Sequence, residues 1–96
     1  MTHAIVLVEA ERSAMATLGQ DLADIDGVGG VYSVTGEWDF VAVVHVKRHE
    51  DLREVVTGGM GALTGVARTQ TMVAFEVFSR HDLEAMFSIG GQGPTA

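Results

Sequence analysis

The sequence predicts a single α+β domain in which a four-stranded antiparallel sheet carries two helices on one face. The chain has 96 residues, which is enough for one domain and no more. Its apolar residues occur in short β-branched runs and in stretches with helical spacing, in the order β-α-β-β-α-β. Hydrophobic residues make up 47% of the chain, a high fraction for so small a domain to bury alone. We therefore expect the domain to associate with another surface.

The first half of the chain is predicted to form a strand, a helix and a second strand. Residues 4–8 are an apolar, β-branched run typical of a strand that is buried on both faces. A helix is expected to begin near Ser13, because one apolar stripe then recurs every three or four positions: Met15, Leu18, Leu22 and Ile25. Asp26 and Gly27 are expected to end this helix, and residues 28–35 to form the second strand.

The second half begins with a short connection that has hairpin chemistry, at residues 36–39. Residues 40–46, FVAVVHV, are then predicted to form the third strand. A second helix is expected to carry a further apolar stripe: Leu52, Val55, Val56, Met60 and Leu63. It also contains three glycines, at 58, 59 and 61, so it should be the weakest element unless close backbone packing requires them. Residues 66–78 are predicted to form a long fourth strand.

This order of elements is the ferredoxin-like split unit, with residues 1–78 as the domain. Right-handed crossovers place both helices on one face of the sheet. The first and third strands are apolar on both faces, so the other face would expose an apolar patch too large for a monomer. We expect a second copy to cover it, sheet against sheet. Residues 79–96 are expected to be a C-terminal extension, with a short helix near Asp82 and then a flexible tail.

Composition excludes several classes of function. The formal net charge of −7 disfavours direct binding to nucleic acid, and no basic cluster is present to contact a membrane surface. The absence of cysteine excludes disulfides and thiolate chemistry. The first ten residues lack the features of a signal peptide and no apolar run is long enough to span a membrane, so cytoplasmic residence is expected.

No catalytic residues, metal site or cofactor are expected. The four histidines fall in different predicted elements, and His45 and His49 are separated by a strand end and a turn rather than sharing a helical face. Neither of the glycine motifs that bind phosphate groups occurs. None of the serines has a neighbouring pattern that suggests an activated nucleophile. The chain is therefore not expected to be an enzyme.

The connection at 35–39, TGEWD, is the candidate ligand site. It contains the only tryptophan, together with a glycine and a carboxylate, between two strands that are poor in charge. In a structural interpretation, Asp39 closes the turn and Trp38 packs on an interface. In a functional interpretation, backbone N–H groups freed by Gly36 hold a carboxylate and Asp39 holds an ammonium, as an amino acid would require. A second polar set lies in the fourth strand: Thr69, Gln70 and Thr71.

Two segments resemble the RAM domain (regulation of amino acid metabolism) of the Lrp/AsnC transcription regulators. TGEWDFVAVVHV at 35–46 is similar to the family's T-G-x-[YFW]-D followed by an apolar strand. LTGVARTQTMVAF at 63–75 is similar to its L-x-G-V-x-x-T-x-T followed by the last strand. The resemblance covers residues 3–78 and does not include the family's DNA-binding helix-turn-helix, so the chain resembles a stand-alone ligand-binding domain.

The resemblance implies a dimer with its sheets face to face, dimers assembled into rings that are often octamers, and small effectors, usually amino acids, bound between dimers. By the family pattern, Gly36, Trp38 and Asp39 lie on the effector loop. The other side of that cleft would carry four further residues: Leu63, Gly65, Thr69 and Thr71. The sequence departs from the pattern at Thr64, where a proline is common, and in the glycine-rich run at 58–61.

The leading hypothesis is a module for effector binding and oligomerisation that modulates transcription regulators or another partner. It would bind an amino-acid-like ligand and could join full-length Lrp/AsnC regulators in mixed oligomers. One alternative is a dimeric α+β-barrel enzyme, such as a monooxygenase or isomerase. It is disfavoured because the residues predicted to lie between sheet and helices are nearly all aliphatic. The other alternative is a purely structural oligomerisation domain.

Overall fold

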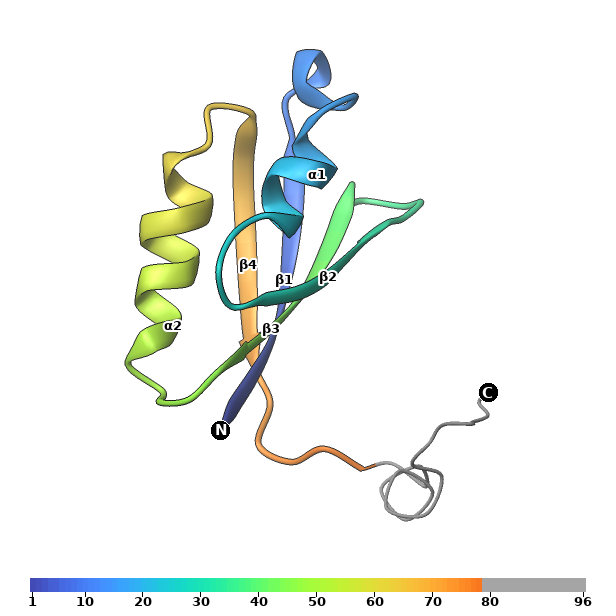
Figure 1. Cartoon of the computed structure of the whole chain (residues 1–96). Helices are drawn as coiled ribbons and strands as arrows, with labels where there is room; N and C mark the ends of the chain where they lie inside the picture. The colour runs from blue at the N-terminus through green and yellow to red at the C-terminus, as the bar shows by residue number, and fades with distance from the viewer. Residues whose placement is uncertain (79–96) are drawn as a thin grey trace, which may run out of the picture.

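The computed structural model describes residues 1–78 as one four-stranded antiparallel sheet with two helical segments (Figure 1). The strands are β1 (Thr2–Ala10), β2 (Val28–Ser33), β3 (Phe40–Val46) and β4 (Val66–Val73). Their order in the sheet is β2-β3-β1-β4, and each neighbouring pair is antiparallel. This arrangement confirms the predicted β-α-β-β-α-β fold.

The ends of the strands follow from which partners each strand has. β3 has the predicted bounds, and β1 is longer than predicted because it pairs with β3 on one side and with β4 on the other. The prediction that the fourth strand continues to residue 78 is wrong. β4 ends at Val73, opposite Ala4, and the last bond beyond it runs from the Ala74 N–H to the His3 carbonyl at 2.9 Å. β1 begins at Thr2, so it offers almost no further length to pair with.

The first helical segment is shorter than predicted. A 3-10 turn, η1 (Arg12–Ala14), precedes the helix α1 (Leu18–Ala23). Leu18 and Leu22 are buried as expected, but Met15 is 42% exposed, so its assignment to the buried stripe is wrong. The break has a packing cause, because Ala14 lies directly against Gly65 and turns the chain before α1 begins. Gly27 follows α1 with a φ of +98°, which confirms the predicted turn.

The second helical segment (residues 51–62) confirms the predicted apolar stripe but is not a regular helix. It consists of α2 (Asp51–Arg53), a π-helical stretch η2 (Glu54–Gly59) and a 3-10 turn η3 (Met60–Ala62). Its stripe packs on the core: Leu52, Val55, Val56, Met60 and Leu63. A Cβ atom on Gly59 would lie 2.7 Å from Cγ2 of Ile25, so close packing against the end of α1 requires this glycine.

The core lies between the two helical segments and one face of the sheet. Alternate residues of the two central strands are buried there: Ala4, Val6, Val8, Phe40, Ala42, Val44 and Val46. The other face, which we call the open face, is also apolar. Ile5, Leu7, Val41 and Val43 are half-buried at its centre. Tyr32 and Met72, on the strands at either side, are 63% and 43% exposed.

Two predictions concern parts of the chain beyond residues 1–78. The short helix near Asp82 and the tail after it lie outside the described residues, as does the proposed boundary at 78/79. Among residues 1–78, no helix has the length and apolar character needed to cross a membrane.

Candidate functional site

The hairpin loop (residues 34–39) joins β2 to β3. The Val34 N–H donates to the carbonyl of Asp39 at 3.0 Å, which closes the loop at its base. Gly36 is exposed and has a φ of +111°, a conformation that L-residues rarely adopt. A Cβ atom there would meet nothing within 4 Å, so backbone conformation rather than crowding requires glycine. The tip of the loop therefore presents open backbone to solvent.

Asp39 anchors the loop to the end of β1. Its Oδ2 accepts a hydrogen bond from the Ala10 N–H at 2.8 Å, and its own N–H donates to the Val8 carbonyl at 2.9 Å. This geometry supports the structural interpretation of Asp39 for one of its two carboxylate oxygens. Among residues 1–78, the other oxygen, Oδ1, accepts no hydrogen bond, and the half-buried position of the side chain would strengthen an ionic contact made there.

Trp38 is tied to β4 by a set of contacts that the sequence did not predict. The guanidinium carbon of Arg68 lies 4.2 Å from the centroid of the Trp38 ring. Arg68 Nε donates to Glu9 at 2.9 Å, and its Nη2 lies 3.5 Å from a carboxylate oxygen of Glu37 in the loop. The hydrogen bond to Glu9 raises the pKa of the Arg68 guanidinium, so the group stays charged. Alternation along the predicted strand separated Arg68 from Thr69 and Thr71, but it did not identify Glu9 or Trp38 as partners of Arg68.

The second predicted set begins just before β4. Leu63 is half-buried and packs against the core. The Gly65 carbonyl accepts a hydrogen bond from the Glu11 N–H at 2.8 Å, and a Cβ atom on Gly65 would collide with Ala14. Packing alone thus explains this glycine.

The two threonines of the predicted site lie on the helix-bearing face. Thr69 pairs with Val8 and Thr71 pairs with Val6, and both valines point into the core. Thr69 is half-buried and Thr71 is exposed, as β4 is an edge strand.

The structure brings the two sets to the same end of the sheet but not onto the same face. Successive N–H groups of Ala10 and Glu11 bind Asp39 and Gly65, so the hairpin loop and the start of β4 flank the end of β1. Trp38 packs with Arg68, which shares the open face with Glu9, whereas Thr69 and Thr71 lie on the helix face. One chain therefore holds the seven residues as two separate surfaces.

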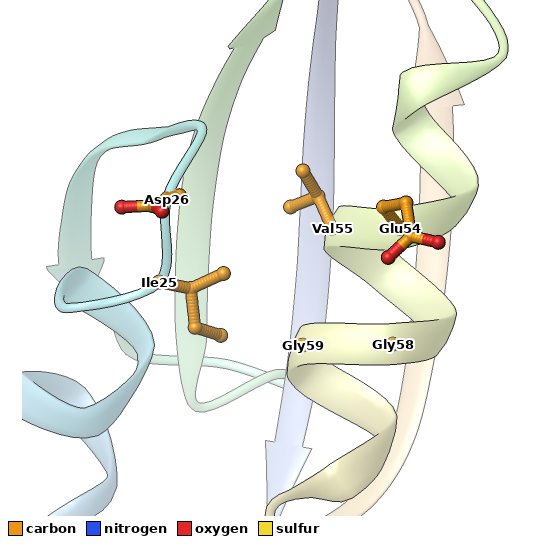
Figure 2. Close-up of a pocket in the computed structure, with 6 residues that line it drawn as sticks. All are labelled: Ile25, Asp26, Glu54, Val55, Gly58 and Gly59. Atoms are coloured by element: carbon orange, nitrogen blue, oxygen red, sulfur yellow. The ribbon is translucent and has the colours of Figure 1, made fainter.

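A hollow of about 440 Å³ lies elsewhere, between the turn after α1 and the second helical segment (Figure 2). It is lined by six residues: Ile25, Asp26, Glu54, Val55, Gly58 and Gly59. None of the predicted site residues is among them, and β2 separates this turn from the hairpin loop. Figure 2 shows its two carboxylates on separate elements, Asp26 on the turn and Glu54 on the helix. The hollow is open rather than enclosed.

Comparison with known families identifies the domain. The model of the Lrp/AsnC ligand binding domain matches residues 3–83. An uncharacterised HTH-type transcriptional regulator of Pyrococcus abyssi is 30% identical over 78 residues, which cover 78% of this chain and 52% of that protein. Another, from Pyrococcus furiosus, is 32% identical over 77 residues, covering 77% of this chain and 51% of the relative. The chain thus spans about half the length of these curated relatives.

Solved structures agree with this assignment. The crystal structure of TTHA0845 from Thermus thermophilus has a TM-score of 0.79 and 42% identity, covering 83% of this chain and 100% of that one. A transcriptional regulator of Neisseria meningitidis, solved as a complex with L-Met, has a TM-score of 0.74 at 15% identity, covering 82% of this chain and 53% of that one. The second likeness is one of fold alone. By its family match and its fold, this chain belongs to the Lrp/AsnC ligand binding domain family.

Proposed function

We propose that this chain binds a small-molecule effector, an amino acid, and couples that binding to its assembly with other copies and with transcription regulators of its family. The observation that carries the proposal is the hairpin loop, where open backbone at Gly36 lies three residues from the carboxylate of Asp39. An amino acid matches both of these protein groups. Its carboxylate can accept hydrogen bonds from the backbone N–H groups, and its ammonium can bind the Asp39 carboxylate. Regulators of the same fold from N. meningitidis and M. tuberculosis have been solved with L-methionine.

The second half of the proposed site comes from another copy. In one chain, Thr69 and Thr71 lie on the face opposite the Trp38–Arg68 contact, so they cannot close over a ligand at their own loop. We therefore place a ligand between the hairpin loop of one copy and the second set of another: Leu63, Gly65, Thr69 and Thr71. A ligand held in this way binds only the assembled state, so mass action favours assembly when ligand is added.

A separate contact is proposed for the open face. Its half-buried aliphatic centre and its exposed Tyr32 and Met72 form a continuous apolar surface that extends over all four strands. We propose that a second copy covers this surface, sheet against sheet, in a homodimer that is the unit of larger rings. Burial of such a surface does not depend on ligand, so this contact should persist in its absence.

The test uses Trp38, the only tryptophan of the chain, as a reporter. Fluorescence and light scattering are recorded on the same samples against each of the twenty amino acids. The proposal expects at least one amino acid to change the emission and to increase the mean particle size. No change of either kind with any amino acid at millimolar concentration would contradict an amino-acid effector.

Two variants separate the roles of Asp39. Asp39→Asn keeps an oxygen that can accept from the Ala10 N–H but removes the negative charge, so it should fold normally and lose the response. Asp39→Ala removes the anchor as well, and should also lower stability by about 1 kcal/mol. Asp21→Asn, a matched loss of charge on an exposed residue of α1, should respond like wild type. A wild-type response in Asp39→Asn would show that Asp39 does not hold the ligand.

The enzymatic alternative has less support. The described residues include no buried polar or charged side chain, so the space between sheet and helices offers no acid, base or nucleophile. The structural alternative is better supported, since Asp39 and Gly65 each have a packing or hydrogen-bonding role that needs no ligand. The Asp39→Asn variant distinguishes it from the proposal.

A further inference from the structure

Two histidines that are 42 positions apart in the sequence meet at one end of the open face. His3 of β1 and His45 of β3 are directly opposite each other in the register of the sheet. Their ring centroids are 4.6 Å apart, with an angle of 62° between the ring planes. Directly opposed residues in antiparallel strands have Cβ atoms only about 4.5–5.5 Å apart, so the backbone itself holds the two imidazoles together.

The residues on either side of the pair leave its edges open. On β2, a Cβ atom on Gly29 would lie 3.7 Å from Cε1 and Nδ1 of His45, so the ring lies over a position that has no side chain. On the other side, just after the end of β4, the neighbour of His3 is Ala74, whose N–H donates to the His3 carbonyl at 2.9 Å. The row across the sheet is thus glycine, histidine, histidine, alanine. In the single chain His45 is exposed and His3 is half-buried, and the pair lies at one end of the open face rather than at its centre.

Within residues 1–78, neither imidazole forms a side-chain hydrogen bond or salt bridge. Imidazole nitrogens are the commonest protein ligands of transition-metal ions, and here the sheet holds two of them close together. That part of the chain has no group of three or more potential ligands, so the remaining positions around an ion would be filled by water.

We propose that His3 and His45 together bind one divalent first-row transition-metal ion, of the class of Zn²⁺ and Ni²⁺. Each neutral imidazole would donate one ring nitrogen at about 2.0–2.1 Å from the ion. Ile5 and Val43 form the next row of the same face, so the ion would lie beside apolar side chains at the margin of the open face. Binding would join the beginning of β1 to the end of β3.

The test is a calorimetric titration of the tag-free chain with Zn²⁺, and separately with Ni²⁺, at neutral pH. The proposal expects one ion per chain. It also expects both His3→Gln and His45→Gln to lower the affinity at least about tenfold, because the second ligand acts at a high effective concentration only when both are present. Mg²⁺, which prefers oxygen ligands, should not bind at this position.

His49→Gln is the matched control, since His49 lies in the turn after β3, four positions from His45, and should keep wild-type affinity. His81→Gln should also keep it. Circular dichroism and thermal melting of each variant without metal show whether a loss reflects unfolding. In wild type and in folded His49→Gln and His81→Gln, the ring signals of both His3 and His45 in NMR spectra should shift together on adding Zn²⁺.

Wild-type affinity in His45→Gln would overturn the proposal. That outcome would place the ion on His3 with the amino terminus, or on His81, neither of which needs His45. Loss of affinity in His81→Gln alone would overturn it in the same way. Since no amino acid is involved, the result is independent of the effector-binding proposal.

Discussion

Asp39 has a structural role, and we propose a binding role for it as well. Its Oδ2 accepts a hydrogen bond from the Ala10 N–H, which fixes the carboxylate in place, and Oδ1 is the oxygen that we propose binds a ligand. The sequence predicted that Asp39 matters, because it follows the only tryptophan in a glycine-containing turn. It did not identify Ala10 as the partner, because that residue is 29 positions away and becomes a neighbour only when β1 pairs with β3.

Gly36→Ala tests whether the conformation of the loop matters for binding. A φ of +111° is strained for alanine, so the loop must change conformation or cost about 1–3 kcal/mol of stability. We expect the response of Trp38 fluorescence to an effector to be lost or shifted to higher concentration. Gly30→Ala is the control, because its φ is not positive and its added Cβ meets nothing within 4 Å. An unchanged response in Gly36→Ala would mean that the loop backbone does not hold the ligand.

Arg68→Ala tests the contact that joins the loop to β4. Removing the guanidinium from the Trp38 ring, together with its contacts to Glu9 and Glu37, should expose the indole to water. We expect a red shift of the emission maximum in the absence of any ligand. Arg48→Ala, which removes another surface arginine with two acidic partners, should leave the emission unchanged. Identical spectra for wild type and Arg68→Ala would show that the stacking does not persist in solution.

At the scale of elements, the spacing of apolar residues predicted the type of each segment more accurately than it predicted where the segment ends. The stripe on the second helical segment was correct in every member because burial follows periodicity. The break before α1 and the early end of β4 were not predictable in this way. The first depends on contact between Ala14 and Gly65, and the second depends on where β1 begins. Both depend on contacts between residues far apart in the sequence, which the local spacing of apolar residues cannot reveal.

The glycines of the second helical segment should behave differently from one another. In Gly59→Ala the new methyl group would lie 2.7 Å from Ile25, so stability should fall by about 1–3 kcal/mol. In Gly61→Ala the nearest atom is the Val56 carbonyl oxygen at 3.6 Å, an ordinary contact, and stability should rise by up to about 1 kcal/mol. Chemical denaturation of the two variants beside wild type measures both changes. Equal effects would contradict the close packing of Gly59 against the first helix.

At the scale of the whole molecule, the open face is the surface through which we propose that two copies pair. The sequence predicted this face because two strands are apolar on both sides, and the structure places both at the centre of the sheet. It also separates the predicted site residues onto two faces, which the sequence alone did not indicate. The family resemblance had already implied a ligand between dimers, and this separation supports that proposal.

Val43→Lys tests the proposed cover of the open face. Val43 lies at its centre, opposite Ile5, and a charge there should prevent a second copy from packing on the sheet. We expect a folded monomer by light scattering in the absence of amino acids. Thr57→Lys adds the same charge at an exposed position of the second helical segment and should leave the particle size unchanged. A variant Val43→Lys of wild-type size would show that copies associate through some other surface.

The most direct test of the central claim is a crystal structure of the chain soaked with a mixture of amino acids. The account predicts electron density for one amino acid between two copies, with its ammonium at Oδ1 of Asp39 and its carboxylate at the backbone of Gly36. Density for an amino acid bound away from the hairpin loop, or a loop that stays empty in crystals of a protein that responds in solution, would contradict it.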